Sequence, residues 1–101
     1  MDTHRQIDQR SLALSRAVVA RIDADPHRGG LALARDNCAR WLNENNQRAV
    51  VEWRDLLERP WEEIRVILLA HTEEAARLRQ NSPFAGVLTP RERWAIYREF
   101  S

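Results

Sequence analysis

Arginine and histidine are the residue types whose spacing in this sequence first suggests chemistry. Arg65 and His71 lie six residues apart in a strongly apolar stretch with helical periodicity. A guanidinium stabilises charge that develops on a phosphodiester, and an imidazole moves a proton. However, Arg21 and His27 have the same spacing, and six residues turn a helix so that two side chains point about 120° apart. The spacing is therefore weak evidence for catalysis, and we expect His71 to be a half-buried structural residue.

Metal ligands and activated nucleophiles are not grouped in the sequence. His71 and Glu74 share a predicted helix face, but His4 and His27 are isolated, so no three ligands converge. No glutamate–histidine pair has the spacing of a di-iron bundle, and no glycine-rich phosphate loop is present. The single cysteine, Cys38, lies on the apolar side of a helical pattern, which is typical of a buried residue. We therefore expect no enzyme activity, no metal site and no cofactor.

Helices must position these side chains, because apolar residues recur every three or four positions and no segment alternates with the period of a strand. Proline, glycine and asparagine separate the predicted helices, which cover residues 3–25, 31–43, 47–58, 60–80 and a last stretch from residue 89 onward. Thr89 and Glu92 predict a capping box at the start of that last helix. The stretch from Val66 to Ala70 is apolar on all sides, so its helix should be the central one. We predict one all-α domain over residues 1–101, an irregular bundle of four to five helices.

The apolar face of each predicted helix defines the expected core. The residues expected to be buried are Ile7, Leu14, Val18, Ile22, Leu31, Cys38, Trp41, Trp53, Leu56, Ile64, Ile67, Leu68 and Leu78. The last helix carries a separate nonpolar strip of Trp94, Tyr97 and Phe100, spaced three apart. Such a strip must dock against another surface, and tryptophan is a frequent anchor of protein interfaces.

Charge is nearly balanced over the chain as a whole but not along it. All 16 basic residues are arginine, and 15 acids leave a net charge of +1, which is too small an excess to indicate nucleic-acid binding. Residues 51–74 contain three arginines and seven acids, a balance of −4. Residues 75–101 contain five arginines and two acids, a balance of +3. An acidic middle and a basic end suit head-to-tail contact with another chain, or pairing within the chain.

Membrane and DNA binding are both disfavoured by the sequence. No segment approaches the roughly 20 apolar residues of a membrane span, and Arg16 interrupts the early apolar stretch, so neither an export signal nor an anchor is predicted. We therefore expect a cytoplasmic protein. A helix-turn-helix would use residues 47–58 as its recognition helix, but Glu52, Asp55 and Glu58 would oppose DNA phosphates there.

The segment from Gln80 to Pro90 is the longest run of the chain without a charged residue. Pro83 and Gly86 stop a helix there, yet the segment is rich in apolar side chains. One interpretation, which we favour, is an ordered loop that folds its apolar residues onto the bundle. The other is an exposed patch that binds a partner protein. The residues of that patch would be Phe84, Val87, Leu88, Trp94, Tyr97 and Phe100.

Two stretches of the chain resemble a family of small bacterial proteins. The tail RQNSPFAGVLTPRERW, from Arg79 to Trp94, resembles a recurring C-terminal motif of small uncharacterised bacterial all-helical proteins. The opening HRQIDQRSL, from His4 to Leu12, resembles theirs as well. Such proteins tend to sit in short gene pairs of the toxin–antitoxin kind, and the resemblance covers about a quarter of the chain. It implies an antitoxin-like or accessory partner protein and transfers no catalytic residues.

The spacing of Arg65 and His71 also resembles that of the HEPN family of helical RNases. Val66 departs from that pattern, because those RNases tend to carry a polar residue directly after the arginine. The leading hypothesis is therefore a non-catalytic protein-interaction module that binds a second copy of itself, as a dimer or larger homo-oligomer, or a genetically linked partner. The alternative is a nucleic-acid-acting helical protein, including a HEPN-like RNase that uses Arg65 and His71.

Overall fold

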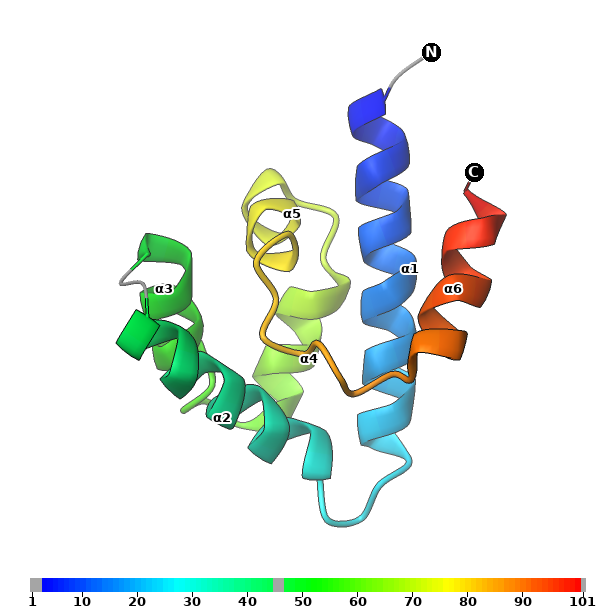
Figure 1. Ribbon diagram of the computed structural model, residues 1–101. Coiled ribbons are helices and arrows are strands. Elements are labelled where there is room, and N and C mark those ends of the chain that lie inside the picture. The colour runs from blue at the N-terminus through cyan, green and yellow to red at the C-terminus, as the bar shows by residue number, and fades with distance from the viewer. Residues whose placement is uncertain (1–2, 45–46, 101) are drawn as a thin grey trace.

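Six helices make up the described part of the chain, residues 3–44 and 47–100 of a computed structural model (Figure 1). They are α1 (Thr3–Asp23), α2 (Gly29–Glu44), α3 (Arg48–Leu56), α4 (Trp61–Leu69), α5 (Glu73–Arg79) and α6 (Pro90–Glu99). These two ranges contain no strand, which confirms the all-α prediction. None of the helices described is long and apolar enough to cross a membrane.

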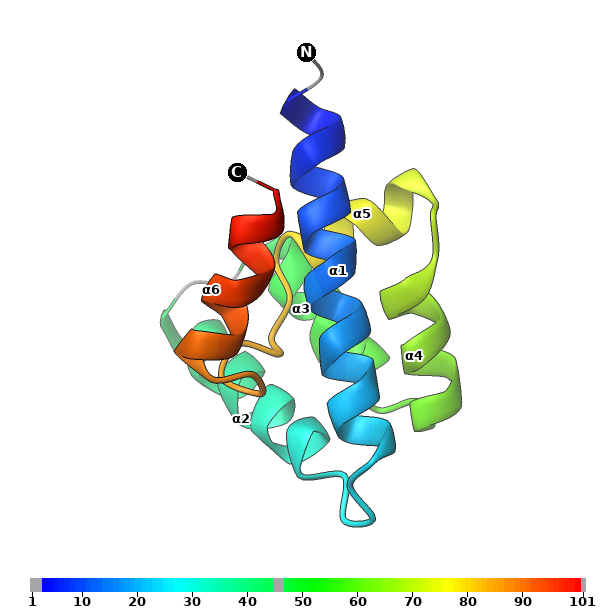
Figure 2. The ribbon, with the colours of Figure 1, turned by 90° about the vertical axis from the view of Figure 1, so that its right-hand side faces the viewer.

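Helix α1 is the element around which the others pack. It contacts α2, α4, α5 and α6, whereas α3 packs against α2. Figures 1 and 2 both show α1 between α6 on one side and α4 on the other. The prediction that the helix over residues 60–80 would be central is therefore wrong. Although that stretch is apolar on all sides, its Val66 side chain is 63% exposed.

The helix predicted over residues 60–80 is in fact two helices, so the described structure has one helix more than the most we expected. Ala70 has extended backbone (φ −71°, ψ 147°) and ends α4. Thr72 caps α5, because its hydroxyl accepts a hydrogen bond from the Ala75 amide at 3.1 Å. Arg79 of α5 donates to the Ala70 carbonyl oxygen at 2.6 Å, which satisfies an acceptor at the end of α4. The apolar spacing continues across this break, so periodicity alone did not reveal it.

One buried cluster contains residues of all five helices from α1 through α5 and of the segment between α5 and α6. Predicted core residues that are buried are Val18, Ile22, Leu31, Cys38, Trp53, Ile64, Leu68 and Leu78. Leu14, Trp41, Leu56 and Ile67 are only partly buried and pack against the edge of this cluster. The side chain of Ile7 lies outside the described residues. The Cys38 thiol donates to the Val50 carbonyl oxygen at 3.2 Å, and burial raises the pKa of this thiol.

Helix α6 is attached to the bundle by its first turn and one side. The predicted capping box is confirmed, because the Thr89 hydroxyl accepts from the Glu92 amide at 3.2 Å and the Glu92 carboxylate accepts from the Thr89 amide at 2.9 Å. Arg21 of α1 forms an ion pair with Glu92, and Ile96 packs against the core. None of the residues of α6 is fully buried. One side of this helix therefore remains on the surface.

Two side chains of α4 test this arrangement. Leu68 is 0% exposed, whereas Val66 is 63% exposed. Leu68→Ala should lower the free energy of unfolding by about 2–5 kcal/mol, because it removes buried methyl groups and leaves a cavity. Val66→Ala should change it by less than about 0.5 kcal/mol. Urea denaturation followed by circular dichroism measures both values, and equal losses would contradict the orientation of α4.

Candidate functional site

Arg65 and His71 do not occupy one continuous helix. Arg65 lies on α4 and donates to the Asp23 carboxylate at 3.0 Å, and Asp23 also accepts from the Trp61 indole at 2.7 Å. The indole hydrogen bond, followed by that of Arg65, lowers the pKa of Asp23. His71 lies beyond the end of α4 and is exposed, so the expectation of a half-buried histidine is wrong. Arg65 therefore links α4 to the end of α1.

The apolar residues between α5 and α6 lie in the core. Phe84, Val87 and Leu88 are 3%, 8% and 4% exposed. The interpretation that these three residues belong to an exposed patch is therefore wrong for this structure. Gly86 has φ +93°, a backbone conformation that favours glycine, and it lets the segment turn so that its apolar residues face inward.

Two residues that the sequence did not single out as functional hold this segment in place. The buried Asn37 amide donates to the carbonyl oxygens of Pro83 and Ala85 at 2.9 and 3.0 Å. The Trp53 ring packs edge-on against Phe84, with ring centroids 5.7 Å apart and planes at 78°. No sequence signal marked Asn37, because its acceptors lie 46 and 48 residues further along the chain.

The remaining residues of the predicted patch lie on α6. Trp94 is 65% exposed, and its ring meets Tyr97 edge-on at 6.2 Å. Tyr97 and Phe100 are partly buried. The Arg10 guanidinium lies over the Tyr97 ring, 5.1 Å from the ring centroid. Arg91, Trp94 and Arg98 lie three to four residues apart and share one exposed side of the helix, which we name the Trp94 face.

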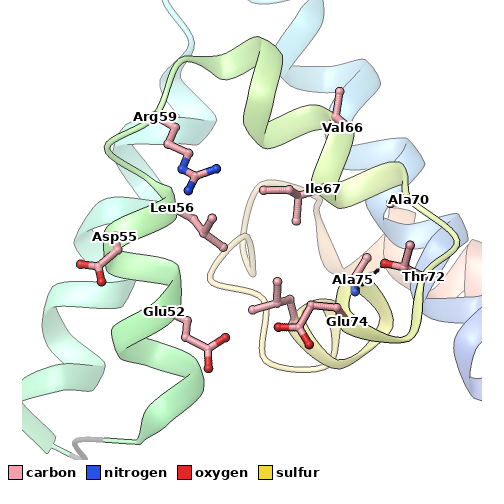
Figure 3. A pocket seen from close by; sticks show the side chains of 11 residues that line it. Glu52, Asp55, Leu56, Arg59, Val66, Ile67, Ala70, Thr72, Glu74 and Ala75 are labelled. Carbon is pink, nitrogen blue, oxygen red and sulfur yellow. Dashed lines mark hydrogen bonds between the residues drawn. The ribbon is translucent and has the colours of Figure 1, made fainter.

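A groove of about 430 Å³ opens between α3, α4 and α5 (Figure 3). Figure 3 shows Leu56 of α3 and Ile67 of α4 pointing toward one another across it. We name this concavity the α3–α5 groove. Its lining residues are Glu52, Asp55, Leu56, Arg59, Val66, Ile67, Ala70, Thr72, Glu74, Ala75 and Leu78. Its floor is apolar, and Val66 extends the apolar surface outward.

Two carboxylates flank the apolar floor of the α3–α5 groove. Figure 3 shows Glu52 and Glu74 on facing sides of it, whereas the Asp55 carboxylate points away from the groove on the side of Glu52. Arg77 donates to Glu52 at 2.6 Å and also pairs with Glu74, and its hydrogen bond lowers the pKa of Glu52. Over residues 48–77, five arginines face seven acids, which leaves a balance of −2. Each carboxylate that lines the groove is thus already paired with an arginine, while residues 48–77 as a whole carry a small acidic excess.

Known proteins provide no further guide to the site. No protein-family model, no curated protein and no solved structure matches the chain. Among the side chains that the structure describes, those of residues 8–44 and 47–100, no three of the histidine, cysteine, aspartate and glutamate types gather closely enough to hold a metal ion. The Trp94 face and the α3–α5 groove are two surfaces that offer a functional interpretation.

Phe84 tests whether the segment between α5 and α6 is structural. Phe84→Asp should lower the free energy of unfolding by at least about 3 kcal/mol, because it deletes a buried ring and buries an unpaired charge. The neighbouring Ala85 is exposed. Ala85→Asp is therefore the matched control and should remain close to the wild type in thermal denaturation. A stable Phe84→Asp protein that had lost association would instead assign Phe84 to an interface.

His71 tests the RNase alternative. Its exposed position beyond α4 leaves it without a helix face shared with Arg65. We expect His71→Ala to leave any RNA-cleaving activity of the purified protein unchanged, as measured on a fluorescent single-stranded RNA. Cleavage by the wild type that disappears in both His71→Ala and Arg65→Gln would support the alternative function.

Proposed function

We propose that the chain is a non-catalytic protein-interaction module that associates head to tail with a second copy of itself. In this arrangement the Trp94 face of one copy docks into the α3–α5 groove of the next. The observation that carries the proposal is the complementarity of these two surfaces. One is an exposed aromatic ring between two guanidiniums, and the other is an apolar groove flanked by the carboxylates of Glu52 and Glu74.

The α3–α5 groove is large enough to hold the Trp94 side chain. Trp94 is 65% exposed, whereas Trp53 and Trp61 are only 1% and 6% exposed. A cavity of about 150 Å³ is enough for a benzene-sized ring. The groove of about 430 Å³ therefore has room for an indole. Burial of a tryptophan in such a pocket is the usual centre of an interaction hot spot.

Arginines on the first surface would meet carboxylates on the second. The Trp94 face carries the guanidiniums of Arg91 and Arg98. The groove is lined by Glu52, Asp55 and Glu74 and by Arg59, and Arg77 pairs with Glu52 and Glu74, so a docking arginine would share these two carboxylates with Arg77. Guanidinium–carboxylate contacts at the rim would orient the docking helix and accelerate the encounter. They would also make the association sensitive to salt, because rim charges are screened.

The two surfaces lie too far apart within one molecule to bind each other. Figures 1 and 2 show α6 and α4 on opposite sides of α1. A contact between different surfaces of identical chains is heterologous and builds a closed ring or an open chain of subunits. A genetically linked protein with an exposed aromatic residue between basic side chains is the other occupant that suits the groove.

Two substitutions at exposed positions test the head-to-tail contact. Trp94→Ala removes the aromatic anchor, and Val66→Arg places a cation at the edge of the groove. We expect wild-type protein to associate at high concentration and each variant alone to be a monomer in sedimentation velocity. An equimolar mixture of the two variants should form a heterodimer, because each supplies the surface that the other lacks. Ala32→Arg, on an exposed position of α2, is the control and should associate like the wild type.

Three outcomes would contradict self-association through these surfaces. The first is a wild-type protein that stays monomeric at high concentration. The second is association that persists in either variant. The third is a mixture that remains monomeric although each variant has lost association, because that result indicates a contact between identical surfaces. A monomeric wild type that binds the product of an adjacent gene through the same residues would assign the groove to a different protein.

A further inference from the structure

A second cavity, of about 170 Å³, lies between α1, α6 and the segment that joins α5 to α6. Its apolar side is formed by residues such as Leu14, Phe84 and Leu88, and Tyr97 of α6 also lines it. Its polar side chains include the hydroxyls of Ser11, Ser15 and Ser82 and two arginines, one from α5 and one from α6. This cavity is separate from the α3–α5 groove and from the exposed Trp94 face.

Arg79 provides the first of the two guanidiniums. Its side chain is only 1% exposed. It donates to the Ala70 carbonyl oxygen at 2.6 Å and to the Asp8 carboxylate at 3.1 Å. Its Nε atom is buried and has no acceptor within the described structure. Asp8 is 45% exposed, so the carboxylate that faces this buried guanidinium is itself partly in solvent.

Arg93 provides the second guanidinium, from the inner side of α6. Its Nε atom is also buried and has no acceptor among the described residues. The ion pairs found in the described ranges do not include Arg93. The Arg10 guanidinium lies over the ring of Tyr97, which also lines the cavity, at 5.1 Å from the ring centre. Arg79, by contrast, pairs with Asp8.

Buried donors without acceptors are costly, and the cost is greatest for charged groups. An anion in the cavity would offset the positive charge and provide oxygen acceptors to the guanidiniums and hydroxyls that line it. Arginine side chains and hydroxyls together form a donor set that suits a phosphate group. A cavity of about 150 Å³ holds a benzene-sized molecule, so this one has room for a phosphate group but not for a nucleotide.

We propose that this cavity is a binding site for a phosphate group, held by Arg79 and Arg93 with the neighbouring serine hydroxyls. The phosphate is either the free ion or the end of a small phosphomonoester whose remaining atoms lie outside the cavity. This inference is independent of head-to-tail association, because none of its residues belongs to the Trp94 face or the groove.

Thermal unfolding and isothermal calorimetry with inorganic phosphate test the site. A ligand as small as phosphate binds no more tightly than the micromolar range. The titration should therefore extend to about 10 mM. We expect phosphate to raise the melting temperature of the wild type above that in sodium chloride or acetate of equal ionic strength. Glycerol phosphate, a small phosphomonoester, is titrated in the same way. Tighter binding than phosphate identifies a phosphomonoester as the ligand, and weaker binding identifies the free ion.

Arg93→Gln is the decisive variant, because Arg79 also bonds carbonyl oxygens at the end of α4 and its loss would disturb the fold. Loss of one guanidinium should weaken phosphate binding at least about tenfold. Without phosphate the variant should be as stable as the wild type or more stable, because it removes a buried donor that has no acceptor. Arg91→Gln, on the exposed side of the same helix, should bind phosphate like the wild type. Equal stabilisation by chloride, no response of the wild type, or unchanged binding by Arg93→Gln would overturn the proposal.

Discussion

The packing of Phe84 against Trp53 is the contact on which the rest of this structure depends. Trp53 is 1% exposed, meets Phe84 edge-on at 5.7 Å and donates its indole N–H to the Leu78 carbonyl oxygen at 2.9 Å. An aromatic pair of this geometry contributes about 0.5–1.5 kcal/mol beyond the burial of its area. Because Phe84 lies between α5 and α6, the same contact determines where α6 begins. The position of the Trp94 face and the shape of the cavity beside Arg93 both follow from it.

Three arginines of this bundle bond carbonyl oxygens at the ends of helices. Arg28, Arg35 and Arg79 donate to the carbonyl oxygens of Ile22, Leu57 and Ala70 at 2.8, 3.1 and 2.6 Å. These acceptors lie at the ends of α1, α3 and α4, where helix carbonyls lack partners within the helix. The guanidinium fork supplies several donors at once, so one side chain can bond such a carbonyl and a second group. Helix α6, by contrast, has no fully buried residue and depends on its cap, Ile96 and the Arg21–Glu92 pair.

Most of the fold was predictable from the sequence, because its signals are local. The spacing of Val18 and Ile22, or of Ile64 and Leu68, indicates a helix with one buried side, and all four residues are buried. The capping box of α6 was predictable for the same reason, since Thr89 and Glu92 are three residues apart. The break at Ala70–Thr72 was missed because the apolar periodicity runs through it. Its stabilising contact comes from Arg79, nine residues away, through a hydrogen bond that periodicity does not encode.

The candidate site was predictable only in part. The sequence by itself determined the helical segments, the opposed charges of its middle and its end, and a tryptophan on the last helix, because each depends on residue type and near neighbours. Tertiary structure alone decided that Phe84, Val87 and Leu88 are core residues and that Trp94 stays exposed. It also brought Leu56 and Ile67 together across the groove and left buried donors on Arg79 and Arg93 without acceptors. The physical reason is that burial and hydrogen-bond satisfaction depend on contacts between distant parts of the chain, such as Asn37 with the carbonyl of Pro83, 46 residues further on.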